Sequence, residues 1–334
     1  MADELVIDVG GHAVSITHPD KVFFKQRGET KLDLVEYYRA VEGPIMETIG
    51  RRPVLLERYP EGAGGKSFFQ KRVPKSAPEW LTTTVVSTPN GTTSDALVAA
   101  DLAHLLWGVN QGCLGFHVWP NRLPDLEAAD ELRIDLDPSP CIELEQLQEG
   151  AVLAHGLLQE LGLEAHVKTS GSRGLHLYIA LEPRWDSYEV RAAAVALARE
   201  LERRHPDRIT AAWWKEERGT RVFVDFNQNA PHKTVFGAWC ARPRVGAQVS
   251  TPITWDDLAT VVPDELTIAT VPARVAERGN PWAGMYERPQ DLTPLLERAA
   301  HDRAGGLPDA PWPPVYPKMP HEPPRVAPSR ARTT

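Results

Sequence analysis

The chain has 334 residues, of which 42% are hydrophobic and 25% charged, and its formal net charge is −8. These values are typical of a globular protein with a substantial core. No apolar run approaches the roughly 20 residues of a membrane span, and the N-terminus lacks the basic and apolar regions of a secretory signal. Cys113, Cys141 and Cys240 are scattered without a CxxC pair, which argues against a disulfide framework or a zinc site. We therefore expect a cytoplasmic protein with no membrane partner.

The N-terminal third combines regular patterns with a basic segment. In chain order, the sequence predicts a hairpin around Gly10 and Gly11, a helix over 32–49 kinked by Pro44, strand and loop over 53–75, and a helix over 94–111 that stops at Gly112. The net charge is +5 over residues 51–75 and −10 over residues 124–164. Such segregation allows a basic surface on an acidic protein.

The central part has the most informative order of elements. It predicts a strand over 132–137, a helix over 142–161, strands over 164–169 and 175–181, a helix over 187–204 and a strand over 221–226. This β-α-β-β-α-β order is that of a ferredoxin-like or RNA-recognition unit, so we expect an α+β fold whose first strand lies between the third and fourth. The remainder predicts a short strand after Arg244, a helix starting at 255–258, a helix over 291–300, and an extended tail with nine prolines over 308–328.

Three carboxylates lie on two of the central strands. Asp135 and Asp137 alternate with apolar residues, so their side chains point to the same face of the strand, about 7 Å apart. On its own strand, the side chain of Asp225 points to the face opposite to that of Val224 and Phe226. In the expected sheet they share the helix-free face with His176 and Tyr178. Hard oxygen ligands of this kind suit Mg²⁺ or Mn²⁺. The Asp-x-Asp pattern alone is not specific, because it is also found in glycosyltransferases, in haloacid-dehalogenase-type phosphotransferases and at solvated strand ends. The third aspartate, on a neighbouring strand, favours a metal site.

Other residues in the sequence suggest phosphate and base contacts. Ser170-Gly171-Ser172-Arg173-Gly174 joins two strands; it serves as a plain hairpin or as a nest of donors for a triphosphate. Further candidates for contacts with a nucleotide are His117, His176, Arg218, Gln228 and Arg242. Each of them also has a purely structural explanation, as a packed or a surface residue. Phe68 and Phe69 lie in the basic segment. They are either one core ring and one loop ring, or exposed rings that stack on bases.

Several motifs together resemble the archaeo-eukaryotic primase superfamily, specifically the bacterial LigD-type polymerase domain. The resemblance covers about residues 10–300, and the tail over 316–326 is similar to the standalone actinobacterial members associated with the ligase LigC. The motifs are His-Pro-Asp-Lys-Val-Phe-Phe (18–24), Phe-Phe-Gln-Lys (68–71), His-Val-Trp-Pro (117–120), Ile-Asp-Leu-Asp-Pro (134–138), Ser-Gly-Ser-Arg-Gly-Leu-His (170–176), Val-Phe-Val-Asp-Phe-Asn-Gln-Asn (222–229), Cys-Ala-Arg-Pro (240–243) and Arg-Gly-Asn-Pro-Trp-Ala (278–283).

The resemblance implies a fold and an active site. It implies a primase-polymerase fold with one catalytic domain over 1–300, in which an N-terminal α/β lobe (about 1–125) packs on an RRM-like lobe (about 126–300), followed by a Pro-rich extension over 301–334. Asp135, Asp137 and Asp225 would hold two divalent ions, Mn²⁺ or Mg²⁺. The implied nucleotide contacts are His117, Ser170, Ser172, Arg173, His176, Arg218, Gln228 and Arg242. The implied DNA contacts are His18, Lys21, Lys31, Phe68, Phe69 and Lys71. His18 stands where LigD-type domains usually have Asn, and Arg173 where many have Lys.

The implied activity is template-dependent nucleotidyl transfer by two-metal phosphoryl transfer, with short gap filling in DNA repair and easy use of ribonucleotides. The implied partners are gapped or primed DNA with a 5′-phosphate and an ATP-dependent DNA ligase acting in trans, and we expect a bacterial, nucleoid-associated monomer. End joining, excision repair and primer synthesis all remain open as its task. Two alternatives are a non-catalytic nucleic-acid-binding or ligase-tethering module, and a haloacid-dehalogenase-like phosphatase with Asp135 as nucleophile and a parallel sheet.

Overall fold

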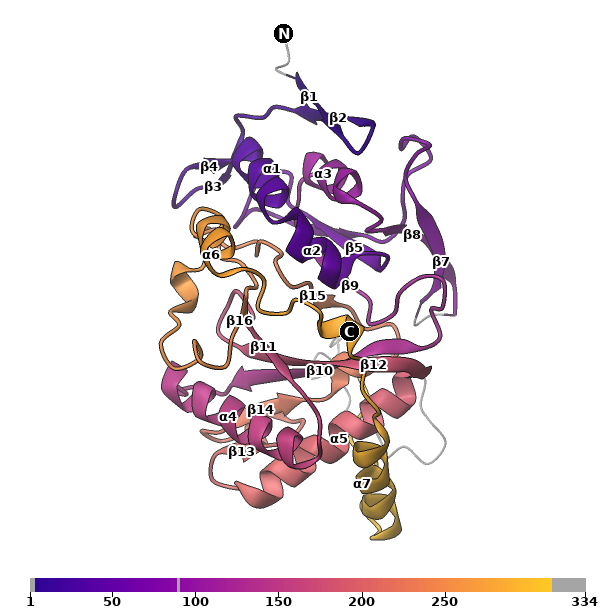
Figure 1. The fold of residues 1–334 in the computed structure, drawn as a ribbon, viewed down its shortest axis with the longest axis vertical. Coiled ribbons are helices and arrows are strands. Elements are labelled where there is room, and N and C mark those ends of the chain that lie inside the picture. Colours follow the sequence, from indigo (N-terminus) through magenta and orange to yellow (C-terminus); the bar gives the residue numbers. More distant parts are fainter. Residues whose placement is uncertain (1–3, 89–90, 314–334) are drawn as a thin grey trace, which may run out of the picture.

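The computed structural model describes residues 4–88 and 91–313 as an α+β fold with two large sheets, one above the other in Figure 1. The β10 sheet has the order β13-β14-β10-β12-β11-β16, and the β5 sheet has the order β15-β9-β5-β8-β7 with β6 paired to β5. The strands of the β10 sheet are β10 (Ala129–Pro138), β11 (His166–Thr169), β12 (Leu175–Trp185), β13 (Ile209–Thr210), β14 (Val222–Asp225) and β16 (Pro252–Ile253). Those of the β5 sheet are β5 (Pro53–Arg58), β6 (Phe68–Gln70), β7 (Thr83–Ser87), β8 (Thr93–Val98), β9 (Cys113–Val118) and β15 (Val235–Phe236).

The other elements surround these sheets. Two small antiparallel pairs are β1 (Glu4–Val9) with β2 (His12–Thr17), and β3 (Val22–Phe24) with β4 (Glu29–Thr30). The helices are α1 (Lys31–Ala40), α2 (Glu42–Ile49), α3 (Leu102–Asn110), α4 (Leu144–Glu160), α5 (Ser187–Arg204), α6 (Val271–Arg278) and α7 (Thr293–Ala304), with short 3₁₀ turns η1 (Lys215–Glu217), η2 (Asn227–Asn229), η3 (Pro263–Glu265) and η4 (Met285–Glu287). Among the described residues, no helix is long and apolar enough to cross a membrane.

The central elements follow the order that the sequence predicts. β10 lies between β12 and β14 and is antiparallel to both. α4 and α5 lie on the same side of this sheet (Figure 1), and Leu175, Leu177 and Ile179 of β12 are fully buried. α5 begins where Asp186 accepts hydrogen bonds from the backbone of Tyr188 and Glu189. The helices therefore cover one face, and the other face of β10 looks toward the β5 sheet.

Three sequence predictions of secondary structure were wrong. Residues 93–98 form β8 rather than the start of a helix, because they pair with β7 and β5; the helix begins only after the Asp101 cap. The helix over 32–49 is two helices that divide at Val41, with Pro44 in the first turn of α2, where a proline is tolerated. Residues 255–258 form a turn, and α6 was missed. Residues 308–313 have no regular structure, and the rest of the predicted tail lies outside the described residues.

Buried charges join the two sheets. Arg52 at the start of β5 is fully buried; its guanidinium lies 2.6 Å from the Glu131 carboxylate of β10 and 2.5 Å from that of Asp130. The other oxygen of Glu131 accepts from Arg133, also buried, at 2.7 Å. The Tyr286 hydroxyl donates to Glu131 as well. Burying these charges is tolerable only because each is paired.

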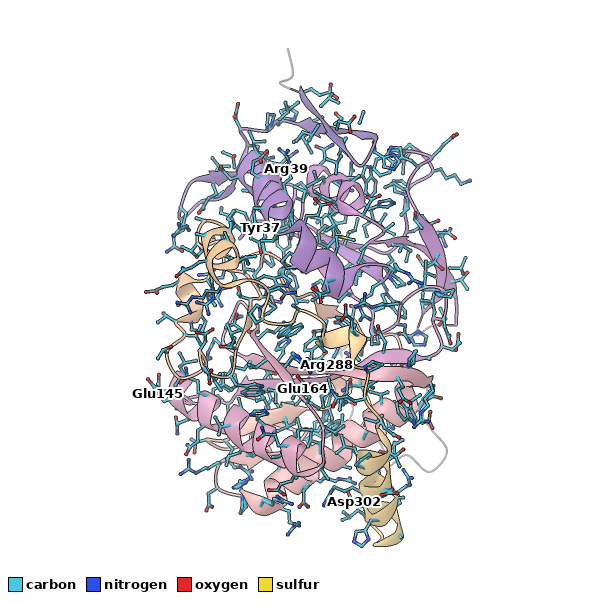
Figure 2. The ribbon with its side chains drawn as sticks, in the orientation of Figure 1. Tyr37, Arg39, Glu145, Glu164, Arg288 and Asp302 are labelled. Carbon is cyan, nitrogen blue, oxygen red and sulfur yellow. The ribbon has the colours of Figure 1, made fainter. Side chains whose placement is uncertain are left out.

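The C-terminal part is held against both sheets. The Tyr37 hydroxyl of α1 donates to the Trp239 carbonyl at 2.7 Å. Figure 2 shows Arg288 beside Glu164, and Arg288 Nη1 lies 3.1 Å from Glu164 Oε2, which ties the segment after η4 to the loop before β11. These two contacts connect the C-terminal segment around Trp239 to α1, and the segment around Arg288 to the loop before β11.

We predict that Glu131→Ala lowers the free energy of unfolding by about 3–5 kcal/mol, because it leaves Arg52 and Arg133 buried without their shared partner. Urea unfolding measures this value. The control is Glu36→Ala, whose exposed ion pair with Arg39 has an N···O distance of 2.9 Å and should contribute less than about 1 kcal/mol. Equal effects of the two substitutions would contradict this account of the sheet junction.

Candidate active site

Strand pairing brings the three aspartates together. Asp135 of β10 lies opposite His176 of β12 on one side and opposite Asp225 of β14 on the other. Asp137 is two residues further along the same face of β10. One carboxylate oxygen from each aspartate lies within 4.8 Å of the other two. The predicted convergence of these side chains is therefore confirmed.

The charges of this cluster are poorly compensated by the protein alone. Burial raises the pKa of Asp135 well above its ordinary value, and the charges of Asp137 and Asp225 raise it further. Burial also raises the pKa of Asp137 and of Asp225. Oδ1 of Asp135 is buried and accepts no hydrogen bond. His176 Nε2 lies 3.2 Å from it, but burial lowers the pKa of this imidazole well below its ordinary value, which favours the neutral ring.

A divalent cation fits this donor set. All three donors are carboxylate oxygens, the ligands that Mg²⁺ and Mn²⁺ prefer. Glycine at position 174 keeps a side chain out of their way: a Cβ there would stand 3.0 Å from the Leu136 carbonyl oxygen, 3.5 Å from Asp137 Oδ1 and 3.6 Å from Asp135 Oδ1. The cluster therefore has the composition and the room for a metal centre.

The turn after β14 holds the cluster in place through its backbone and amide groups. Asn227 N–H donates to Asp225 Oδ1 at 2.8 Å, and Gln228 Nε2 donates to Asp225 Oδ2 at 2.8 Å and lies 3.5 Å from Asp135 Oδ2. Asn229 exchanges two hydrogen bonds with the backbone of Arg133, at 2.8 and 2.6 Å. This turn, η2, thus links β14 to β10. Of its three side chains, the sequence analysis singled out only Gln228.

A hollow of about 270 Å³ opens beside the carboxylates. It lies between the open face of the β10 sheet and the ends of β9 and β15. Its lining includes seven of the eight predicted nucleotide contacts: His117, Ser170, Ser172, Arg173, His176, Gln228 and Arg242. The other lining residues are Asp135, Asp137, Gly174, Thr234, Val235 and Phe236. Tyr178 shares the face but is covered by the Trp282 ring, with ring centroids 5.1 Å apart, so it does not reach the hollow.

The loop over 170–174 has an internal framework. Ser170 Oγ accepts from the backbone N–H groups of Ser172 and Gly174 at 3.1 and 3.0 Å, so this hydroxyl shapes the loop. Gly171 has φ +67°, and a Cβ there would meet Arg242 Cγ at 2.5 Å. Ser172 Oγ accepts from Arg244 at 2.7 Å, a contact that the sequence analysis missed.

An aromatic ring that the sequence did not reveal organises the far wall. Phe236 of β15 packs under the Arg242 guanidinium, 4.2 Å from its centroid, and against the His117 ring at 4.9 Å. His117 Nε2 also lies 3.4 Å from Glu57 Oε2. The pKa of Glu57 is lowered to about 2, mainly by this contact. Thr234, Val235 and Phe236 carry no motif that distinguishes them from packing residues, so only the pairing of β15 with β9 could place them here.

Arg218 does not line the hollow. Its guanidinium lies 3.5 Å from the centroid of Phe223 and donates to the carbonyls of Ala212 and Trp213 at 3.1 and 2.8 Å. It nevertheless acts electrostatically on the aspartates, because its charge lowers the pKa of Asp137 against the effect of burial. The Arg218 guanidinium therefore lies near the three aspartates but outside the hollow.

The predicted DNA contacts form two groups. His18 is exposed, Lys21 N–H donates to its carbonyl at 3.1 Å, and Lys31 N–H donates to the Lys21 carbonyl at 2.9 Å, so these three residues share one corner. Burial and the nearby Lys21 lower the pKa of Lys31 to about 8. Phe68 and Phe69 of β6 are 48% and 54% exposed, which confirms exposed rings rather than a core ring. The exposed Lys71 follows them, and Phe69 is 5.8 Å from His117 between ring centroids.

Comparisons with known proteins agree with this fold and site. Residues 30–282 match the family described as "LigD, primase-polymerase domain". The chain is 34% identical to the multifunctional non-homologous end joining protein LigD of Mycolicibacterium smegmatis over 269 residues, covering 80% of this chain and 35% of that protein. It is 30% identical over 280 residues to the bifunctional non-homologous end joining protein LigD of Bacillus subtilis, covering 83% of this chain and 45% of that protein.

A solved structure has the same fold. The polymerase domain from Mycobacterium tuberculosis ligase D in complex with DNA aligns with a TM-score of 0.78 and 31% identity, covering 83% of this chain and 99% of that one. The chain belongs to the LigD primase-polymerase domain family, whose members are DNA-directed nucleotidyltransferases that use divalent metal ions and nucleoside triphosphates. The chain spans between about a third and a half of the length of the LigD proteins it matches.

We predict that Asp135→Asn stabilises the metal-free protein at pH 8. A raised carboxyl pKa means that the folded protein favours the protonated group; this stabilisation is complete below the ordinary value of 3.8 and is lost as pH rises through the raised pKa. The variant should melt roughly 2–4 °C higher than the wild type, corresponding to about 1 kcal/mol. Added Mn²⁺ should stabilise the wild type and not the variant. A lower melting temperature for the metal-free variant at pH 8 would contradict this electrostatic account.

Proposed function

We propose that this chain is a template-dependent nucleotidyltransferase that fills short gaps during DNA repair. One observation carries the proposal: two members of the three-aspartate cluster, Asp135 and Asp137, line a hollow whose walls also carry guanidinium, imidazole, hydroxyl and amide groups. Anionic metal ligands beside cationic donors suit a metal-bound triphosphate.

In this proposal the carboxylates of Asp135, Asp137 and Asp225 hold two divalent ions. Held there, such ions would supply Lewis-acid chemistry: a lower pKa for a primer 3′-hydroxyl and positive charge for the triphosphate and the leaving pyrophosphate. The protein keeps the three carboxylates close in spite of their repulsion, and the Gln228 amide donates to Asp225 Oδ2 and so helps to hold that carboxylate in place. The family resemblance favours Mn²⁺ over Mg²⁺.

The other residues of the hollow would hold the nucleotide. Arg242, Arg173 and His117 supply positive charge or N–H donors to its phosphates, and the Ser170 loop supplies backbone and hydroxyl donors. His176 is held between Asp135 and the stacked Tyr178 ring, so it can offer one N–H without moving. Arg218 stands outside this set and would act through its charge. Easy use of ribonucleotides is part of the proposal.

The two groups of DNA contacts support a gapped substrate. Phe68 and Phe69 offer exposed rings next to Lys71 and beside His117, a combination suited to a template base that stacks close to the nucleotide. His18, Lys21 and Lys31 share a corner in which Lys21 pairs with Glu61 at 3.0 Å, and in which burial and the Lys21 charge lower the pKa of Lys31. A second anion there would favour the charged form of both lysines. A 5′-phosphate on the far side of a gap would be such an anion.

We further propose how this enzyme is organised and used. The strand order supports one catalytic domain over 1–300 in which the β10 sheet is an RRM-like unit and residues 1–125 form the lobe packed on it. The chain would act as a monomer in the cytoplasm, associated with the nucleoid, on primed or gapped DNA, with an ATP-dependent ligase supplied in trans. Repair by non-homologous end joining is favoured by the names of its relatives; base-excision repair is the other pathway we propose.

The two alternatives from the sequence fare differently. A haloacid-dehalogenase-like phosphatase needs a parallel sheet around its nucleophile, but β10 is antiparallel to both β12 and β14. That alternative is therefore excluded. A non-catalytic DNA-binding module would not need three aspartates held against their mutual repulsion, and it predicts DNA binding without primer extension.

Primer extension tests the proposed function. With Mn²⁺, the wild type should extend a primer across a short gap with a 5′-phosphate, whereas Asp225→Asn should lose more than about 100-fold in rate because it removes a metal ligand. The exposed Asp8→Asn in β1 is the matched control and should extend normally. Lys21→Ala should reduce extension only when the 5′-phosphate is present. Absence of extension by the wild type, with DNA binding retained, would favour the non-catalytic module.

We predict that Phe69→Ala weakens binding of template DNA by about 1–3 kcal/mol, because an exposed ring that stacks on a base contributes this amount. Fluorescence anisotropy with a gapped duplex measures the loss. Val85→Ala is a suitable control, because Val85 is an exposed apolar residue on β7 of the same sheet, with 59% of its surface accessible. If Phe69→Ala binds the duplex as tightly as Val85→Ala does, the template lies elsewhere.

A further inference from the structure

We infer that residues 307–312, named the strap here, position Asp225 for metal binding, an inference that rests on the proposed function. The strap follows α7, which packs along α5 on the helix-covered side of the β10 sheet (Figure 1). It therefore reaches the end of β14 from the face opposite the hollow. Nothing in the sequence motifs or in the family resemblance assigns it a role in the reaction.

The strap is held by an arginine in α5. Arg191 is 1% exposed, and its Nη2 donates to the carbonyls of Ala310 and Pro311 at 2.9 and 3.1 Å. Its Nη1 donates to Asp309 Oδ1 at 3.2 Å, and its guanidinium lies 3.7 Å from the centroid of Trp312. Trp312 Nε1 in turn donates to Asp309 Oδ2 at 2.7 Å. The strap thus supplies the buried guanidinium with two carbonyl acceptors, a carboxylate and an aromatic face.

The same arginine reaches the turn that carries the metal ligand. Arg191 Nε donates to Asn227 Oδ1 at 2.7 Å, and Asn227 Nδ2 donates to the Pro311 carbonyl at 3.0 Å. Arginine, strap and turn therefore close a ring of hydrogen bonds around the buried Asn227 amide. The backbone N–H of Asn227 donates to Asp225 Oδ1 at 2.8 Å. Moving the strap would move a donor bonded directly to one of the three carboxylates.

Physical chemistry gives this connection a consequence for the metal. Metal affinity depends on groups behind the ligands, because these groups fix the orientation and basicity of each donor atom. Without the strap, Arg191 would keep a buried charge but lose the acceptors at Asp309, Ala310 and Pro311, which would weaken the hold on its guanidinium beside Asn227. Asn227 would lose the Pro311 acceptor at the same time. Asp225 would then be less well ordered for binding an ion.

Titration with Mn²⁺, followed by electron paramagnetic resonance of the free ion, tests the strap without relying on activity. We expect Trp312→Ala to weaken Mn²⁺ binding about 10-fold, and Asp309→Asn to weaken it in the same direction. The control for general loss of stability is Leu106→Ala, a buried position in α3 on the other side of the molecule. It should lower the melting temperature and leave the Mn²⁺ affinity unchanged.

The outcomes separate this inference from the proposed function. If folded Trp312→Ala and Asp309→Asn bind Mn²⁺ as the wild type does, the strap only stabilises the fold and the inference is overturned. If Trp312→Ala does not fold, Asp309→Asn alone decides, since Asp309 is partly exposed and its substitution keeps the side-chain size. If the wild type binds no Mn²⁺, or binds it equally well after Asp225→Asn, the proposed metal site itself fails and the inference fails with it.

Discussion

The register between β10 and its two neighbours is the constraint on which the site depends. Side chains alternate along a strand, so a slip of one residue would turn Asp135 and Asp137 into the helix-covered core and expose Leu136. Asn229, just after β14, exchanges two hydrogen bonds with the backbone of Arg133 and so helps to hold the register, and Glu131 ties β10 to Arg52 beside the other sheet. These contacts therefore help to decide where the carboxylates point.

The three carboxylates that the proposed reaction needs also lower the stability of the metal-free protein. Three buried carboxylates repel one another, and burial raises the pKa of each. The fold compensates for this cost around the cluster rather than inside it, through the amides of η2 and the guanidinium of Arg242 on Phe236. A divalent cation held by the three carboxylates would offset their repulsion. The same carboxylates that weaken the metal-free protein are thus the basis of the proposed chemistry.

The sequence predicted what depends on local pattern and missed what depends on tertiary pairing. Alternation along β10 and β14, and the Asp186 cap of α5, were enough to anticipate the central sheet and the convergence of the aspartates. Residues 94–98 read as helix because Leu97 continues the apolar spacing of α3, but pairing with β7 made them a strand. Phe236 and Asn227 were missed for a related reason, since their roles come from partners far away in the chain. The phosphate contact of Arg218 stays a prediction; its guanidinium rests on Phe223, a packing partner that the sequence did not reveal.

The most direct test is a crystal structure of the protein with Mn²⁺ and a non-hydrolysable nucleoside triphosphate, measured at the manganese absorption edge. The account predicts two anomalous peaks held by Asp135, Asp137 and Asp225, with the triphosphate between Arg242 and the Ser170 loop. Anomalous density elsewhere, or a triphosphate bound away from the three aspartates, would contradict it.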